Sequence, residues 1–229
     1  AEDPIEYTLP GITQVQVLRE KNQTFAMILR TFLRQDPDIM LIGETRDPET
    51  AKASMEAAQT GHLVLTTLHA NNSASSITRL LDMDVPHYLI TSSLLGVLSQ
   101  RLLRRLCTEC SVSRPVTEAE AALTRLAVGT PIRAPSALSA EEKEKAKQEQ
   151  RLCSRCHGVG YKGRVGAYEL MPVSSGIKAA IRDQRSSQEI QEVACQEGMV
   201  TLEDYGRALV RNGITSVAEL QRLCSSAFD

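Results

Sequence analysis

The amino-acid sequence predicts an α/β fold in its first hundred residues, built on a parallel sheet whose strands are joined by helices. In some segments apolar residues recur with the 3.6-residue period of a helix, and in others they form short continuous runs. Turn-forming residues bound these runs, which favours strands covered on both faces of a parallel sheet. Strand, helix, strand, helix in this order is typical of right-handed crossover connections.

The first two elements are a helix and a strand. TFAMILRTFLR, residues 24–34, predicts an amphipathic helix with Thr24 as its N-cap, and Asp36-Pro37 ends it. IMLI, residues 39–42, predicts a strand buried on both faces.

The next elements repeat this order. Residues 47–61 predict a helix that begins at an N-cap Asp and ends at a Gly, and residues 62–69 predict a second buried strand. Residues 73–83 and 86–106 predict two further helices, the second with a stripe of leucines.

The sequence changes character after residue 106. SAEEKEKAKQEQ, residues 139–150, has no apolar stripe and predicts a solvated helix or a mobile insertion. Residues 172–229 are again helical in pattern. They carry N-cap signals and glycine stops, at Ser186, Thr201, Ser216, Gly198 and Gly213.

Composition excludes several classes of protein. With 229 residues, 42% hydrophobic and 24% charged, the chain is not disordered throughout. A net charge of −2 gives no general basic field for nucleic acid or anionic lipid, and we interpret Arg101, Arg104 and Arg105 as one helix face. The run 88–98 is too short to span a bilayer, and AEDPIEY at the start is not a signal peptide. The missing initiator Met favours a fragment or a processed chain.

Polar residues follow both predicted strands. Glu44, Arg46 and Asp47 come after the first strand, and His69 comes after the second. Ligands of open parallel sheets bind beyond the carboxyl ends of the strands, so a carboxylate and an imidazole are expected at one crevice. An apolar strand followed by an acid matches a Walker B element, whose carboxylate binds Mg²⁺ or orients water. Taken alone this match is weak, and Asp47 explains itself as a helix cap.

Three stretches together carry a specific resemblance. EDPIE at 2–6, RQDPDIMLIGETRD at 34–47 and TGHLVLTTLHANNSASSITRLLDM at 60–83 resemble the Asp box, Walker B and His box of the secretion ATPase superfamily, in its order and spacing. This family comprises the RecA-like hexameric motors of type II secretion and of type IV pilus assembly and retraction. The resemblance implies a partial RecA-like P-loop NTPase core. One departure is Thr45, where the family usually has an apolar residue, and we expect it to alter packing rather than chemistry.

Residue roles follow from the resemblance. It implies that Glu6 positions the lytic water, that Glu44 is the Walker B acid near Mg²⁺, and that His69 faces the γ-phosphate of ATP. His62 would lie nearer the subunit interface. Alternatives remain open, because His62 also suits a core histidine and Glu6 a surface acid.

The same resemblance extends nucleotide binding to four more residues, which are Glu2, Asp3, Arg46 and Asp47. No G-x-x-x-x-G-K-[ST] loop occurs in the chain, so the segment that cradles phosphates is missing. In the family this Walker A loop precedes the Asp box. We therefore expect the chain to be a carboxyl-terminal portion that is inactive or nearly so alone.

Four of the six cysteines form two C-x-x-C pairs, Cys107/Cys110 and Cys153/Cys156. Two such pairs present four sulfurs to one metal, which predicts a tetrahedral Zn²⁺ site. Gly158 and Gly160 supply the positive-φ turns that a metal knuckle needs.

The cysteine spacing also matches two other kinds of site. CSRCH also matches the haem c attachment motif, but that use leaves the first pair unexplained; a redox dithiol is a further alternative. Cys195 and Cys224 are expected in helix cores. Assembly-type motors resemble this chain in their tetracysteine insertion and in a stretch like GRVGAYEL at 163–170. Retraction motors generally lack the cysteines.

The sequence therefore predicts three segments with different roles. Residues 1–106 would complete the RecA-like core, 107–165 would form a zinc module with a charged insertion, and 166–229 would form a helical carboxyl-terminal region. The resemblance implies a cytoplasmic hexamer that hydrolyses ATP and reaches the inner membrane through platform proteins, with no nucleic acid and no membrane span of its own. The alternative from another class is a noncatalytic, zinc-stabilised interaction module.

Overall fold

The structure is a computed structural model that describes residues 1–21 and 23–225, and the chain divides into two compact units. Unit 1 comprises residues 1–97 and 171–198, and unit 2 comprises 98–170 together with the chain from 199 onward. The chain passes between the units within β3 (Gly96–Leu106) and within β6 (Tyr161–Pro172), two strands that pair with each other. The predicted segments 1–106, 107–165 and 166–229 were distinguished by their roles, whereas these two units are distinguished by their internal contacts. The three segments therefore stay a prediction.

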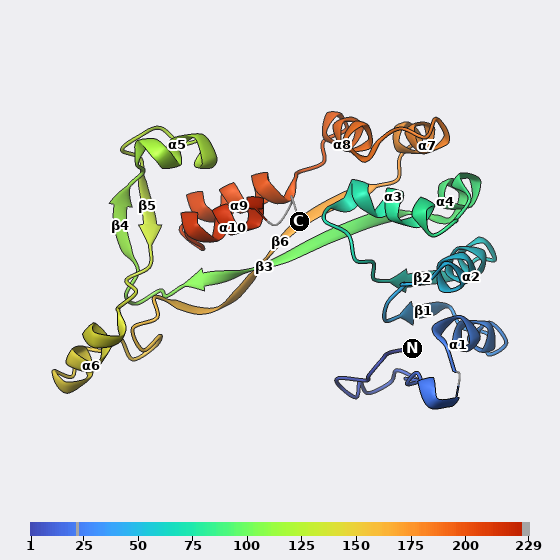
Figure 1. Cartoon of the computed structure of the whole chain (residues 1–229), viewed down its shortest axis with the longest axis horizontal. Coiled ribbons are helices and arrows are strands. Elements are labelled where there is room, and N and C mark those ends of the chain that lie inside the picture. Colours follow the sequence, from blue (N-terminus) through green and yellow to red (C-terminus); the bar gives the residue numbers. More distant parts are fainter. Residues whose placement is uncertain (22, 226–229) are drawn as a thin grey trace. The chain divides into compact units, whose positions relative to one another are not determined.

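Unit 1 contains a small parallel sheet and helices (Figure 1). Its elements are η1 (Arg19–Lys21), α1 (Phe25–Phe32), β1 (Ile39–Ile42), α2 (Pro48–Gln59), β2 (Leu63–Thr66), α3 (Ser73–Asp82), α4 (His87–Ser93), α7 (Ser175–Arg182) and α8 (Ser187–Gln196). β1 and β2 pair in parallel, from Ile39 opposite Leu63 to Ile42 opposite Thr66. The predicted order of strand, helix, strand, helix is confirmed.

One face of this sheet forms the core of unit 1. Met40 and Ile42 of β1 pack with side chains of α1 and α2, including Leu29 and Ala57, and all four are buried. At about 25 cal/mol per Å² of apolar surface removed from water, burying each large side chain contributes about 2 kcal/mol. The helices therefore hold the strand ends at fixed positions.

The other face of the sheet is exposed. Ile39, Leu41, Leu63 and Leu65 are 62%, 50%, 42% and 46% exposed. The register places Ile39 beside Leu63 and Leu41 beside Leu65, so the four side chains form one apolar patch. The prediction of strands buried on both faces was wrong for the described residues, because helices of unit 1 cover one side only.

Side-chain caps set the helix starts. Thr24 caps α1 by accepting from the Met27 N–H, and Asp47 caps α2 by accepting from the Thr50 N–H. Ser186 caps α8 in a reciprocal capping box with Glu189. These predicted caps are confirmed; replacing such a cap by Ala typically costs about 1 kcal/mol.

The predicted helix over 86–106 was wrong. Helix α4 ends at Ser93, and residues 96–106 form strand β3. The predicted stripe comprised Leu94, Leu95, Leu98, Leu102 and Leu106. Leu95, Leu98 and Leu102 are exposed and Leu106 is buried, whereas Leu103, which lies outside the stripe, is fully buried. Residues 96–106 form a strand because they pair with β6, which lies far along the sequence. The spacing of apolar residues within 96–106 carries no information about this distant partner.

Unit 2 packs a hairpin and helices around its part of the β3–β6 ladder. Its further elements are β4 (Val112–Pro115), α5 (Glu118–Thr124), β5 (Pro131–Ala134), α6 (Ala140–Gln148), α9 (Leu202–Arg211) and α10 (Val217–Ser225). Its core joins Leu103, Val116 and Ile132 to the apolar faces of α9 and α10. Helix α6 has no buried residue, so the predicted solvated helix is confirmed.

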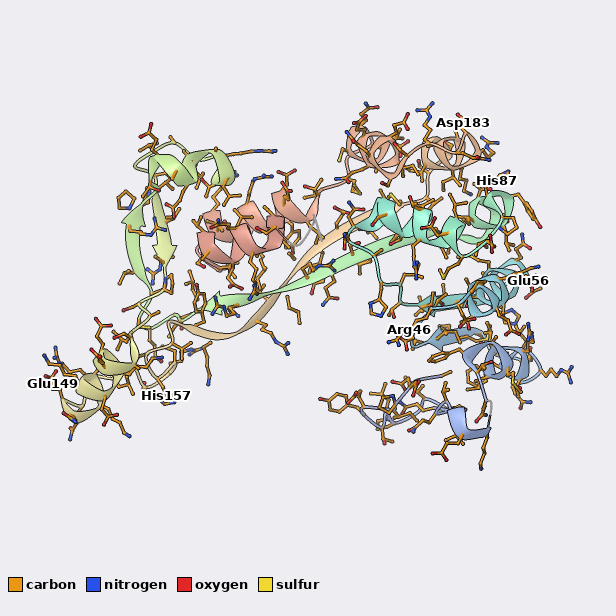
Figure 2. All side chains as sticks on the ribbon, in the orientation of Figure 1. Arg46, Glu56, His87, Glu149, His157 and Asp183 are labelled. Carbon is orange, nitrogen blue, oxygen red and sulfur yellow. The ribbon has the colours of Figure 1, made fainter. Side chains whose placement is uncertain are left out.

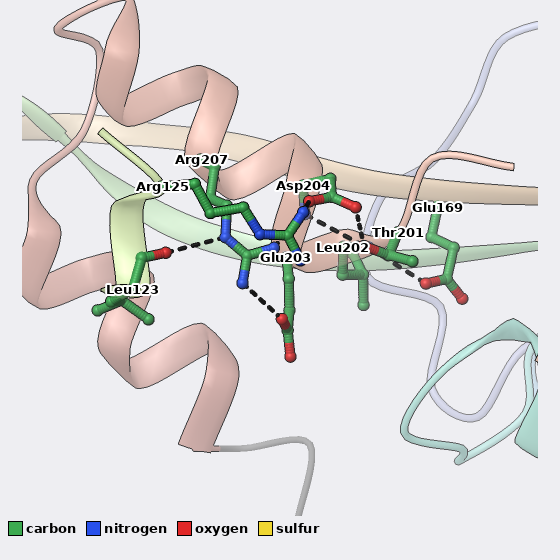
Figure 3. Close-up of polar contacts among 8 residues, drawn as sticks. All are labelled: Leu123, Arg125, Glu169, Thr201, Leu202, Glu203, Asp204 and Arg207. Carbon is green, nitrogen blue, oxygen red and sulfur yellow. Dashed lines mark hydrogen bonds and ion pairs between the residues drawn. The ribbon is translucent and has the colours of Figure 1, made fainter. Parts of the chain in front are cut away.

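A polar network fastens the start of α9 (Figure 3). The buried Glu169 carboxylate accepts from the Leu202 N–H at 3.1 Å, and Thr201 caps the helix as predicted. Arg207 donates to the Leu123 carbonyl at 2.9 Å and pairs with Asp204 at 2.7 Å. These polar groups are partly buried and hydrogen-bonded to one another, and the Arg207–Leu123 bond joins α9 to α5. The network therefore fixes α9 against the end of α5.

A second polar group makes unit 2 sensitive to acid. Arg114 donates to the Glu120 carboxylate at 2.7 Å, and the Thr117 N–H donates to it at 3.1 Å. The Arg114 hydrogen bond is the main cause that lowers the pKa of Glu120 to about 2; burial opposes the shift and Thr117 adds to it.

Stability from Glu120 is expected to be lost between about pH 4.5 and pH 2. The folded pKa lies below the ordinary value of 4.5, so the contribution is complete above that value and vanishes as the folded carboxylate protonates. After screening it is on the order of 1–2 kcal/mol. Urea unfolding of wild type and Glu120→Gln should differ at pH 7 and converge at about pH 2 and below. The exposed Glu118→Gln is the control, and a difference independent of pH would contradict the assignment.

Within the described residues, none of the helices is both long and apolar enough to span a bilayer.

Candidate nucleotide and metal sites

Glu44 and His69 lie together beyond the carboxyl ends of β1 and β2. The last paired residues are Ile42 and Thr66, and each side chain follows its own strand by two or three residues. The His69 Nε2 is 3.7 Å from the Glu44 carboxylate, and the Arg46 Nε donates to the same oxygen. The convergence expected from the strand-end rule is therefore present.

Exposure differs within this group, which we call the Glu44 cluster (Glu44, Arg46 and His69). The Glu44 side chain is only 15% exposed, whereas those of Arg46 and His69 are 58% and 78% exposed. A carboxylate held in place beside two accessible basic groups can bind a hydrated cation, and the basic groups can reach an anionic ligand. Figure 2 shows Arg46 at this end of the sheet.

Backbone hydrogen bonds hold the loop after β1. The Thr45 N–H donates to the Thr67 carbonyl at 2.9 Å, and the Thr67 hydroxyl donates to the Gly43 carbonyl at 2.6 Å. The buried Thr45 hydroxyl lies 2.8 Å from that of Thr66. The polar residue at position 45 is thus satisfied by a polar partner on the next strand, which agrees with the expectation that it alters packing.

The N-terminal segment runs beside the end of β1. The Gly43 N–H donates to the Ala1 carbonyl at 2.8 Å, and a bridge joins Glu2 to Gln16. The Glu2 carboxylate accepts from the Gln14 amide at 2.7 Å, and Asp3 is half-buried before a cis proline. This pairing brings Ala1 and Glu2 to the strand end that carries Glu44.

Three predicted site residues lie apart from the Glu44 cluster or are otherwise engaged. Glu6 is exposed, and the structure records no hydrogen bond or ion pair between it and another described residue. Both oxygens of Asp47 accept from Thr50, as a helix cap. His62 precedes the first residue of β2, so it lies at the opposite end of that strand from His69. Its Nδ1 is 2.9 Å from the Thr60 hydroxyl. The structure alone therefore does not bring these three to the cluster.

The four paired cysteines of unit 2 gather at one point. The sulfurs of Cys107, Cys110, Cys153 and Cys156 all lie within 4.8 Å of one another. Two separations are 3.8 Å, between Cys107 and Cys153, and 3.4 Å, between Cys110 and Cys156. Tetrahedral zinc with Zn–S bonds of about 2.3 Å requires sulfurs about 3.8 Å apart, whereas a disulfide requires about 2.05 Å. The donor set fits zinc.

Backbone turns shape the second knuckle. His157, Gly158 and Gly160 all have positive φ, and the Gly160 N–H donates to the Cys156 sulfur at 3.3 Å. Burial raises the pKa of the Cys156 thiol, but that N–H and the neighbouring cysteines outweigh it and lower the pKa to about 7. The predicted glycine turns are confirmed. They aim a donor at sulfur, as thiolate ligands need.

Glu109 is a residue that the sequence analysis missed. It lies inside the first C-x-x-C, and its carboxylate accepts from the Ser154 hydroxyl at 3.2 Å and lies 3.7 Å from the Cys153 sulfur. The contact ties one knuckle to the other. A polar residue between paired cysteines was the available signal.

Comparison with known proteins decides the family. The model of one protein family, described as "Type II/IV secretion system protein", matches residues 1–222. The chain belongs to this family. Type II/IV secretion system proteins similar to it include the "Type IV pilus assembly ATPase PilB" of Thermus thermophilus, 47% identical over 221 residues, which are 96% of this chain and 23% of that protein. The "Type II secretion system protein E" of Pseudomonas aeruginosa is 44% identical over 97% of this chain and 41% of its own length.

A solved structure of the family agrees with the fold. The crystal structure of the pilus retraction motor PilT with bound ADP aligns with 97% of this chain and 50% of its own, at 26% identity and a TM-score of 0.64. The predicted α/β fold is confirmed. The chain spans well under half the length of the curated type II/IV secretion system proteins named above.

Proposed function

We propose that this chain forms the carboxyl-terminal part of a hexameric ATPase motor that powers type II protein secretion or type IV pilus assembly. The observation that carries the proposal is the Glu44 cluster, where a half-buried carboxylate and an imidazole meet 3.7 Å apart at the ends of paired parallel strands. Relatives whose names state an ATPase or a secretion protein share most of the chain.

Each residue of the cluster has a proposed role. Magnesium-bound ATP supplies the phosphoryl group and the charge that the reaction must stabilise. Glu44 would hold the metal through its water shell, with Arg46 balancing its charge, and His69 is accessible enough to face the terminal phosphate. Phosphoryl transfer needs orientation and charge neutralisation more than covalent chemistry, so these side chains suit it.

The N-terminal acids complete the proposed site. Glu6 would position the attacking water, and Glu2 and Asp3 would support it from the segment that pairs beside Gly43. Asp47 would act by fixing the start of α2 behind Arg46. His62, at the other end of β2, would serve a neighbouring subunit. Closing Glu6 onto the cluster requires a ligand or a second subunit in this scheme.

The cysteine cluster would hold one structural zinc ion. All four positions of a tetrahedral ion would be filled by thiolates, which leaves none for a substrate. We assign the ion to the folding of unit 2 and not to catalysis. The motor would lie in the cytoplasm and reach the inner membrane through platform proteins.

Glu44→Gln is expected to lower ATP hydrolysis about a hundredfold in the longer protein that joins this chain to a phosphate-binding loop, because it removes a charge needed in the transition state. Glu56→Gln, an exposed acid of α2 (Figure 2), is the matched control and should keep full activity. The 229-residue chain alone should hydrolyse ATP hardly at all. Full activity of the Glu44 variant would remove Glu44 from the catalytic scheme, whereas a longer wild-type protein that does not hydrolyse ATP would favour the noncatalytic interaction module.

A further inference from the structure

A basic pocket lies between α4 and α7, within unit 1. Its volume is about 280 Å³, and it is lined by Thr91, Ser92, Ser175, Lys178 and Arg182. We propose that this pocket binds a phosphate-bearing ligand with two linked phosphoryl groups. The site is separate from the Glu44 cluster: Figure 2 shows Asp183, the residue after α7, well apart from Arg46.

Two cationic side chains line the pocket. Lys178 and Arg182 are four residues apart on α7, where like charges on neighbouring turns destabilise a helix. Among the described residues, no carboxylate lies within ion-pair distance of either. Two nearby acids have other partners: Asp183 lies 3.7 Å from Arg185, and Glu197 accepts from the Ser174 hydroxyl at the start of α7. An anion between the two cations would relieve their repulsion.

Three hydroxyl groups also line the pocket. The hydroxyls of Thr91 and Ser92 donate to carbonyls of their own helix, those of Tyr88 and Leu89. Ser175 is different: within the part of the chain that the structure describes, its hydroxyl has no recorded partner. Ser174 already caps the start of α7 and the Glu197 carboxylate lies beside it, so the donor that this turn offers to an anion is the Ser175 hydroxyl.

The spacing selects the ligand. Ser175, Lys178 and Arg182 stand at i, i+3 and i+7, along one face of the helix. Seven residues of α-helix extend about 10 Å, which a diphosphate can bridge with the help of the two long side chains. A single phosphate contacts only one end of this row. The pocket therefore favours a diphosphate group over inorganic phosphate.

Titration of the whole chain with pyrophosphate tests the proposal. Followed by amide NMR, it is expected to give saturable shifts at Ser175, Gly176, Thr91 and Ser92, with inorganic phosphate binding about tenfold more weakly. Lys178→Ala and Arg182→Gln should each lower the affinity about tenfold, as expected for one charge-assisted contact. The exposed Lys52→Ala of α2 is the charge-matched control and should bind as wild type.

A second experiment distinguishes the possible sources of the phosphate. Sedimentation with vesicles of phosphatidic acid, compared with phosphatidylcholine, asks whether a lipid headgroup supplies it. Vesicle binding that depends on Lys178 and Arg182 but not on Lys52 identifies a headgroup, whereas pyrophosphate binding alone identifies a free phosphorylated molecule. Either result supports the site. No binding in both arms, or equal losses for the Lys52 variant, would overturn it, and Arg182 is exposed enough that its variant should fold.

Discussion

Cys153→Ser is expected to release zinc and to unfold the region of unit 2 around the cysteine cluster. Four sulfurs within 4.8 Å of one another are held there by segments 46 residues apart, and the proposed zinc ion would be the strongest link between them. In small zinc domains the binding free energy is about 10–16 kcal/mol and is spent on folding. Loss of one ligand should therefore cost unit 2 several kcal/mol.

Elemental analysis and hydrogen exchange would measure this effect. Wild type should carry about one zinc per chain, and the variant much less, with faster amide exchange at residues 107–115 and 153–161. Exchange in α2 of unit 1 should not change. Cys195→Ser, an exposed cysteine of unit 1, is the matched control. Zinc-free wild type with full protection of unit 2 would refute the metal assignment.

Glu219→Ala is expected to lower the free energy of unfolding of unit 2 by about 3 kcal/mol. The Glu219 side chain is 1% exposed and accepts from the Arg104 N–H at 2.7 Å, the Arg104 Nε at 2.8 Å and the Arg222 guanidinium at 2.8 Å. Removing one partner of a buried ion pair typically costs 3–5 kcal/mol, and the half-exposed arginines place this case at the lower end.

The neighbourhood of Glu219 explains why the loss should spread to β3. The Arg104 guanidinium lies 4.3 Å from the centre of the Tyr161 ring, and the Arg104 carbonyl accepts from the Thr215 hydroxyl at 2.8 Å. Hydrogen exchange of β3 amides in urea would report the change. Glu118→Ala, an exposed acid of the same unit, should stay within about 0.5 kcal/mol of wild type. Equal stability of the Glu118 and Glu219 variants would count against the ion pair.

Features set by neighbouring residues could be predicted from the sequence. The caps at Thr24, Asp47 and Thr201 each depend on a side chain and the N–H three residues later, so the local sequence contains all that is needed. The approach of Glu44 to His69 was also predictable, because the strand-end rule needs only the order of the elements.

Features set by distant partners could not be predicted. Strand β3 forms because β6 pairs with it, and its leucine spacing suits a helix equally well in isolation. The tie between Glu109 and Ser154 joins segments that are 45 residues apart. The pocket on α7 likewise arises from α4, whose contribution lies more than 80 residues upstream.

The uncovered side of the β1–β2 pair has a practical consequence. Two rows of branched aliphatic groups, stacked across the ladder at Ile39/Leu63 and Leu41/Leu65, meet water where proteins usually place a second layer. Exposing apolar side chains to water is unfavourable, so association that buries this patch lowers the free energy. Purification of the 229-residue polypeptide thus calls for low concentration or a mild surfactant. Crystals grown from it should bury this apolar patch against a symmetry-related molecule.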